Sequence, residues 1–222
     1  MSNEAKEMQL GREALILMQK SWPEHFGCLF EMGQKAFETA FDKYPHFKTY
    51  FAFTDDQWRK DERFKKVVLG LEQTLAQGVT VFCEPKSSEE QNDSITEYIS
   101  LLEEIGGLHK GIVPTMEPKH IDMFLVLVPA VVVDCIEKKR KTGPFEAAEK
   151  QQLIECWTAL SKFIAKHMRA GWDKSVVPKT PKLKKAYRRK TMSISSVDSN
   201  SDSESPPKRA TSVGSNQRPA KK

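Results

Sequence analysis

The chain has 222 residues, of which 39% are hydrophobic, and a formal net charge of +5. This length suits one well-packed domain with an extension, since a single domain commonly takes about 100–200 residues. The charge is uneven, because residues 173–222 carry 13 Lys and Arg against 4 Asp and Glu, which leaves residues 1–172 with a net charge of −4. Binding to nucleic acid or to an anionic membrane is therefore excluded for all but the basic tail.

The first residues and the cysteines indicate a cytoplasmic protein. Residues 1–7 lack the apolar core of a signal peptide. The most apolar stretch, 123–133, is about half as long as a membrane span, so no transmembrane segment is expected. Residues 1–9 are expected to be flexible. Four cysteines without metal-ligand spacing are expected to be reduced thiols: Cys28, Cys83, Cys135 and Cys156.

Apolar residues recur with a helical period along most of residues 10–172, which predicts an all-α domain. No stretch alternates as a strand would, no heptad pattern persists, and no internal repeat indicates a solenoid. Prolines separate the helices, and residues 84–94 are polar enough to predict a loop. The predicted helices span about residues 10–22, 26–44, 64–82, 95–109, 119–139 and 145–172.

His109 lies near the C-terminal end of a predicted short amphipathic helix, on the same side as Leu101 and Ile105. A histidine directed from an apolar helix face into a core needs partners for its ring nitrogens. One such partner is a backbone carbonyl, which would make His109 a structural residue. Another is a metal, and haem iron suits an apolar surround. The histidine alone leaves both interpretations open.

Four features of the chain follow one another in a distinctive order. Trp22 ends the first helix, Phe51 follows Pro45 by six residues, and His109 ends a later helix. The last helix contains Trp157-x-x-Leu160-x-x-x-Ile164-x-x-x-Met168-x-x-Gly171. Residues 10–172 thus resemble a globin, most closely the intracellular invertebrate globins of nematode type. The resemblance implies a globin fold of seven to eight helices around haem b, with a diatomic gas as the ligand.

The resemblance also implies roles for single residues. His109 matches the proximal histidine that bonds the haem iron, and its other ring nitrogen should donate to a backbone carbonyl of the same helix. Phe51 matches the phenylalanine that stacks on the haem face, and Phe37 matches a position that faces the bound gas. The remaining pocket positions are the distal Val67 and Leu71, followed by Ile105, Val113, Phe124 and Leu127.

The distal side departs from the usual globin pattern. Val67 stands where globins usually have histidine or glutamine, and Phe37 replaces a tyrosine of many related globins. Bound oxygen would lose a hydrogen bond of about 1–3 kcal/mol and leave faster, whereas carbon monoxide and nitric oxide would lose less. This favours a sensor, a redox module or a nitric-oxide handler over an efficient oxygen store. A shift of one helical turn would instead bring Lys66 or Gln73 to the pocket.

Several alternatives stay open. The loop over residues 83–96 is longer than globins usually have there, so it is either a surface insertion or a hinge that lets the distal helix move. A second alternative is a haem enzyme, either peroxidase-like or a nitric-oxide dioxygenase. The sequence shows neither the distal acid–base pair nor the dinucleotide loop that would support it. A haem-free globin-like interaction module would leave His109 without a role. The other histidines are predicted at the surface or at helix caps: His25, His46, His120 and His167.

Residues 173–222 are rich in Pro, Ser, Lys and Arg and are predicted to be disordered. Residues 179–190 contain seven Lys and Arg, which is typical of a solubilising extension, a nuclear-localisation patch or a site for anionic lipid or nucleic acid. Residues 188–193 resemble a basophilic kinase site, and phosphate there would reduce the positive charge. Besides the gas, the partners left open are a second copy of the chain, an anionic membrane, nucleic acid and a kinase.

Overall fold

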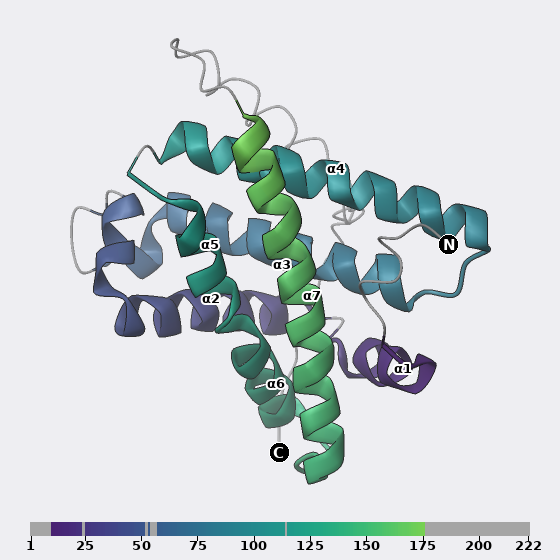
Figure 1. The fold of residues 1–222 in the computed structure, drawn as a ribbon. Coiled ribbons are helices and arrows are strands. Elements are labelled where there is room, and N and C mark those ends of the chain that lie inside the picture. The colour runs from purple at the N-terminus through teal and green to yellow at the C-terminus, as the bar shows by residue number, and fades with distance from the viewer. Residues whose placement is uncertain (1–9, 24, 52, 54–56, 114, 176–222) are drawn as a thin grey trace, which may run out of the picture. The chain divides into compact units, whose positions relative to one another are not determined.

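In the computed structural model, the described residues form seven α-helices, two short 3-10 helices and no strand (Figure 1). The predicted all-α class is thereby confirmed for this part of the chain. All of these residues belong to one compact unit. The predictions for residues 1–9 and 176–222 lie outside the described residues. Described are residues 10–23, 25–51, 53, 57–113 and 115–175.

The helices follow one another through short connections, and none that is described is long and apolar enough to cross a membrane. Local chemistry sets several of their ends. Asp61, for example, accepts a hydrogen bond from the backbone N–H of Arg63 at 2.8 Å and so caps the third α-helix. The elements are α1 (Arg12–Ser21), α2 (Phe26–Lys43), η1 (Pro45–Phe51), η2 (Trp58–Lys60), α3 (Glu62–Cys83), α4 (Ser88–Ile112), α5 (Pro118–Leu125), α6 (Val128–Lys139) and α7 (Ala147–Lys174).

The predicted loop over residues 84–94 is wrong, because α4 already begins at Ser88. Ser87 and Glu90 form a capping box, in which each side chain accepts the backbone N–H of the other residue at 3.3 and 3.0 Å. Gln91 also donates its side-chain amide to the carbonyl of Val81 at 2.6 Å. The connection is therefore only residues 84–87, and the helix that carries His109 has 25 residues. No long loop exists here that could act as a hinge.

A second correction concerns residues 119–139, which form α5 and α6 instead of one helix. Leu127 closes the end of α5 by donating its N–H to the carbonyl of Phe124 at 3.0 Å. Pro129 has no N–H to continue the pattern of hydrogen bonds and sits in the first turn of α6, where none is needed. The break places Phe124 at the end of a short helix.

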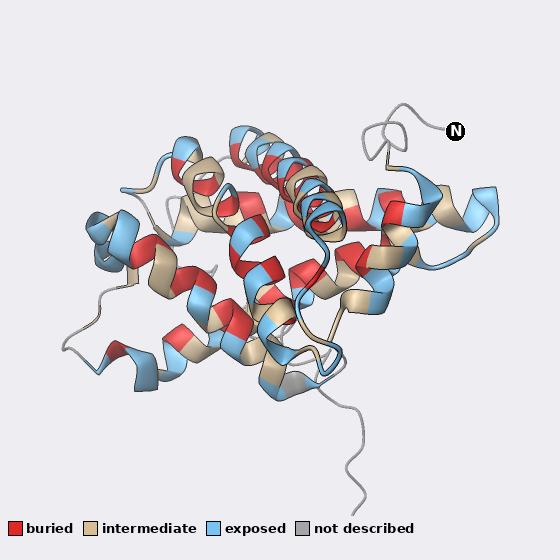
Figure 2. Cartoon of the chain, turned by 90° about the horizontal axis from the view of Figure 1, so that it is seen from below, coloured by how far each residue is buried: buried red, intermediate tan, exposed pale blue. Residues whose placement is uncertain are grey.

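The core consists of two apolar clusters on the inward sides of the helices (Figure 2). The larger one surrounds the middle of α7, where Trp157, Leu160 and Ile164 are fully buried. We call the smaller one the aromatic cluster. Leu71 and Phe124 pack against both clusters. The aromatic cluster is defined by Phe37, Phe41, Phe47, Phe51, Phe53, Trp58, Phe64 and Phe124, with Val67, Leu71 and Leu127 packed against it.

Helices α3 and α4 run in opposite directions (Figure 1). Gln91 contacts Val81 near the connection, and further along Tyr98 donates its hydroxyl to the carbonyl of Thr74 at 2.8 Å. Residue numbers thus fall along α3 as they rise along α4. These bonds join the C-terminal half of α3 to the N-terminal half of α4.

Candidate functional site

His109 presents one free ring nitrogen from the last turns of α4. Its Nδ1 atom lies 2.8 Å from the carbonyl oxygen of Ile105. A carbonyl only accepts hydrogen bonds, so Nδ1 carries the proton and Nε2 keeps its lone pair. No hydrogen-bond partner of Nε2 is found within the described part of the chain. The predicted bond to a carbonyl of the same helix is confirmed, and Nε2 remains available to a metal.

The protonation state of His109 also suits a metal ligand. Burial lowers the pKa of His109, and the bond to the Ile105 carbonyl offsets this effect only in part. The imidazole is therefore neutral at pH 7, which is the form that binds metal ions. Within the described ranges, no group of three or more His, Cys, Asp and Glu side chains could hold a metal ion. A metal at Nε2 would thus need ligands that come with it, as the porphyrin of haem supplies.

Glycines bring the His109 turn into direct contact with α7. A Cβ atom on Gly106 would overlap the backbone carbonyl of Met168, and one on Gly171 would overlap that of Glu103. Both glycines are buried where α4 crosses α7. The two backbones can approach this closely only because neither position carries a side chain. The crossing fixes the part of α4 that immediately precedes His109.

The aromatic cluster contains most of the other predicted pocket residues. The ring of Phe37 lies 5.8 Å from that of Phe51 and 4.7 Å from that of Phe124, measured between centroids. Val67 and Leu71 pack against the same cluster, as does Leu127. The structure thus brings together predicted residues from α2, η1, α3 and α5.

Two predicted residues lie on the α4 side instead. Ile105 packs against the larger core cluster, which it shares with Leu71 and Phe124. Val113 caps the end of α4 by donating its N–H to the carbonyl of His109 at 3.0 Å, and it is not part of the aromatic cluster. Leu71 and Phe124, which pack against both core clusters, therefore connect the aromatic cluster to the cluster that Ile105 contacts.

The side chains of α3 that face the aromatic cluster are apolar. Val67 and Leu71 are half-buried, whereas Lys66 and Gln73 are exposed. The alternative register, in which Lys66 or Gln73 enters the pocket, is therefore wrong. Gly33 on α2 fixes this register, because a Cβ there would come within 2.9 Å of the Val68 side chain.

Glu72 is a buried carboxyl group that sequence reasoning missed. Its side chain is 4% exposed, and Oε1 has no hydrogen-bond partner among the described residues. It lies against Gly33, where the missing Cβ makes room for it. Burial raises the pKa of Glu72 to about 7. The signal was its helical spacing, because Val68, Leu75 and Val79 on the same face of α3 are all buried.

His120 joins η1 to α5. Its Nδ1 accepts the backbone N–H of Glu117 at 2.9 Å and lies 3.1 Å from the hydroxyl of Tyr50. Because the amide can only donate, Nδ1 is an acceptor and Tyr50 donates to it. His120 is thus a buried helix cap, as one of the two predictions for it required.

The remaining histidines and the cysteines play no part in the candidate site. His25 and His46 are exposed, as predicted. His167 is buried beside Phe163, so its predicted place at the surface or at a cap is wrong. It shares the buried face of α7 with Leu160 and Ile164 by helical spacing. All four cysteines are free thiols, as expected.

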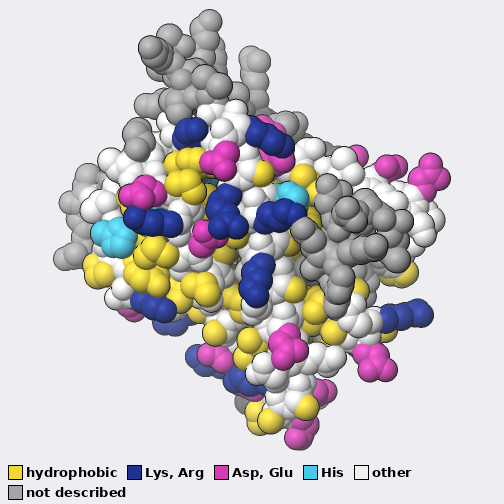
Figure 3. Space-filling view, viewed as in Figure 1, with side chains coloured by type: hydrophobic (Ala, Val, Ile, Leu, Met, Phe, Trp, Pro, Cys, Tyr) yellow, Lys and Arg dark blue, Asp and Glu magenta, His cyan; other side chains and the backbone are white. Residues whose placement is uncertain are grey.

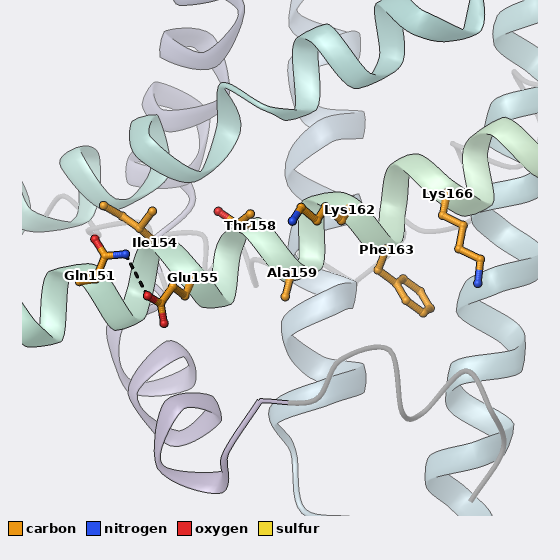
Figure 4. A pocket seen from close by; sticks show the side chains of 8 residues that line it. All are labelled: Gln151, Ile154, Glu155, Thr158, Ala159, Lys162, Phe163 and Lys166. Carbon is orange, nitrogen blue, oxygen red and sulfur yellow. Dashed lines mark hydrogen bonds between the residues drawn. The ribbon is translucent and has the colours of Figure 1, made fainter.

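The structure also contains a groove of about 660 Å³ along α7 (Figure 4). None of the predicted pocket residues lines it. On the face of the molecule shown in Figure 3, Lys and Arg side chains are intermixed with Asp and Glu, and hydrophobic side chains lie between them. The groove is lined by Gln151, Ile154, Glu155, Thr158, Ala159, Lys162, Phe163 and Lys166.

Comparison of the chain with models of known protein families finds no match, and comparisons with curated protein sequences and with solved structures find none either. The candidate site therefore rests on its residues and their geometry.

Proposed function

We propose that the chain is a globin that binds haem b through His109 and reversibly binds a diatomic gas on the opposite side of the iron. The observation that carries this proposal is the geometry of the His109 imidazole, whose Nδ1 is held by the Ile105 carbonyl and whose Nε2 has no hydrogen-bond partner among the described residues. His109 would be the protein ligand to the haem iron, and haem held in this way would supply the iron that binds oxygen, nitric oxide or carbon monoxide.

The residues present fit haem in donor type and in polarity. Haem would supply a redox-active iron with four nitrogen ligands, which the described side chains do not provide. The residues that would hold it are the predicted set of His109, Phe51, Phe37, Val67, Leu71, Ile105, Val113, Phe124 and Leu127, of which only His109 offers an ionisable group. Because these walls offer no hydrogen-bond donor to bound oxygen, the ferrous iron would oxidise more readily.

The chain's own residues favour sensing or redox chemistry over oxygen storage. The carbonyl of Ile105 holds the imidazole in the tautomer that ligates iron. Val67, Leu71 and Phe37 offer no hydrogen bond to a bound gas, so oxygen is expected to leave quickly. No acid–base pair stands among them, which supports a gas-binding protein instead of a haem enzyme.

Haem uptake by the full chain tests the proposal. Purified chain titrated with haemin should saturate at one haem per chain and develop a Soret band. His109→Gly should lose most of this uptake, and added imidazole should restore the spectrum by taking the place of the lost ligand. His46→Gly, at an exposed histidine, is the matched control and should bind haem normally. A wild-type chain that does not saturate with haemin would refute the proposal.

A haem-free globin-like interaction module is the second candidate. One observation favours it: the rings of Phe37 and Phe124 touch directly, with their centroids 4.7 Å apart, so the aromatic cluster packs without a cofactor between them. In that case haemin should bind without a defined stoichiometry and should leave the melting temperature unchanged. The proposed globin should instead melt at a higher temperature when loaded.

A further inference from the structure

The C-terminal end of α7 is tied to the turn of α4 that carries His109. Lys110 donates its ammonium group to the carbonyl of Trp172 at 3.0 Å and to that of Ser175 at 2.9 Å. The last carbonyls of a helix have no partners within the helix, and a cation at this end also interacts favourably with the helix dipole. Lys110 thus satisfies the carbonyl of Ser175 and adds a charged donor to the carbonyl of Trp172, which also accepts the N–H of Ser175 at 3.3 Å.

Three more contacts join the same two segments. The hydroxyl of Ser175 lies 3.5 Å from the carbonyl of Gly107, and Lys174 pairs with Glu103 at 2.6 Å. The close crossing at Gly106 and Gly171 completes the set. We call this arrangement the α4–α7 clasp. It consists of Glu103, Gly106, Gly107 and Lys110 on α4, and of Gly171, Trp172, Lys174 and Ser175 at the end of α7.

The clasp residues of α4 flank His109 in the sequence. Lys110 is the next residue after His109, and Gly106 precedes it by less than one helical turn. Hydrogen-bonded helical turns move as stiff units, so a displacement of the His109 turn carries the Lys110 backbone with it. Because Nζ holds two carbonyls, that displacement pulls on the end of α7 or breaks the bonds.

The other end of the clasp is the point from which the basic tail continues. Ser175 is the last residue that the structure describes, and the stretch with seven Lys and Arg begins at residue 179. Figure 1 shows the end of α7 crossing α4. A change at His109 therefore has a direct mechanical route to the first residues of the tail.

We propose that Lys110 is a positioning residue that couples His109 to Ser175, so that iron binding at His109 alters the anchoring of the C-terminal tail. The inference rests on the proposed haem binding. Ser175, from which the basic tail continues, is held by the same helical turn that carries the iron ligand. Iron binding would thus affect a tail whose basic stretch is suited to an anionic partner.

Hydrogen exchange on the full chain tests this coupling. Loading with haem should slow exchange of the amides at residues 172–175, because ligation fixes the His109 turn. Lys110→Met keeps the aliphatic stem but removes the donor, and it should make these amides exchange about tenfold faster and insensitive to haem. Lys110→Arg keeps a donor and should restore the response. Lys162→Met, at an exposed lysine of α7, is the matched control.

The iron–histidine stretching frequency of the ferrous protein is the second readout, since a residue with only a structural role would not move it. It should shift in Lys110→Met and return in Lys110→Arg. Far-UV circular dichroism checks that each variant folds, and Lys110→Gln replaces Lys110→Met if it does not. The proposal is overturned if haem leaves exchange at residues 172–175 unchanged, or if the stretching frequency is the same in all variants. A chain without haem uptake overturns the proposed function as well, whereas a loaded chain without the response overturns only the coupling.

Discussion

The two sides of the candidate site are held together by different forces. On the α4 side, backbone contact at Gly106 and Gly171 combines with directional hydrogen bonds from His109 and Lys110. On the other side, rings from α2, η1, α3 and α5 pack against one another, and few polar groups take part. Directional contacts fix the place of one atom, whereas ring packing defines only an apolar volume. Atomic positions are therefore fixed most tightly around His109, whereas the ring packing around Phe37 tolerates more variation in side-chain position.

The largest expected effect comes from the glycine crossing. Gly171→Ala would drive a Cβ into the backbone of Glu103, which cannot be relieved by a rotamer change. We expect a loss of about 4 kcal/mol in the free energy of unfolding by urea, or a failure to fold. The control is Gly70→Ala in α3, where a Cβ meets no atom within 4 Å and should stabilise the helix by about 0.5–1 kcal/mol. If the two variants lose equal free energy of unfolding, then the backbone contact at Gly171 is not the tight constraint on the α4 side that we infer.

A smaller effect is expected from Glu72, the buried carboxyl group behind the aromatic cluster. Its pKa is raised by burial to about 7, so folding favours the protonated form. This contribution to stability is fully present below the unfolded pKa of about 4.5 and is lost as the pH rises through 7. Glu72→Gln should therefore gain about 3 kcal/mol over the wild type at pH 8 and almost nothing at pH 4. Urea unfolding at both pH values measures this, and an equal gain at both would rule out titration of Glu72 as the cause.

The smallest effect concerns the polar link from Tyr50 to His120. Burial is the main reason why the pKa of His120 is lowered; Lys119 and His46 lower it further, and the Glu117 carboxylate opposes them. Folding thus favours neutral His120, and this stability is present above pH 6.5 and lost as the pH falls through the lowered pKa.

We expect this link to contribute about 1 kcal/mol at pH 7.5 that disappears near pH 5. His120→Asn offers an amide oxygen in the place of Nδ1 and cannot titrate, so its unfolding free energy should depend less on pH than that of the wild type. Tyr50→Phe should lose only the bond between η1 and α5. The pH dependence of unfolding for the two variants separates these roles, and an unchanged slope in His120→Asn would contradict the assignment.

Sequence reasoning succeeded where one periodic pattern decided the outcome. The apolar spacing predicted the helices, and the resemblance to globins implied the bond of His109 to a carbonyl of its own helix. It failed where side chains act on the backbone. The polar residues 84–94 indicated a loop, but the capping box at Ser87 and Glu90 starts a helix there. Glu72 was missed because its charge suggested solvent, whereas its neighbours at helical spacing are buried.

The short connection at residues 84–87 has a consequence for the order of folding. Because of it, the helices that carry Val67 and His109 are neighbours in sequence and form one antiparallel pair. Such local pairs assemble before distant segments meet, since they close only a small loop. The clasp, by contrast, needs α7, which lies more than 60 residues further along the chain. We therefore expect a folding chain to pair α3 with α4 early and to close the α4–α7 clasp last.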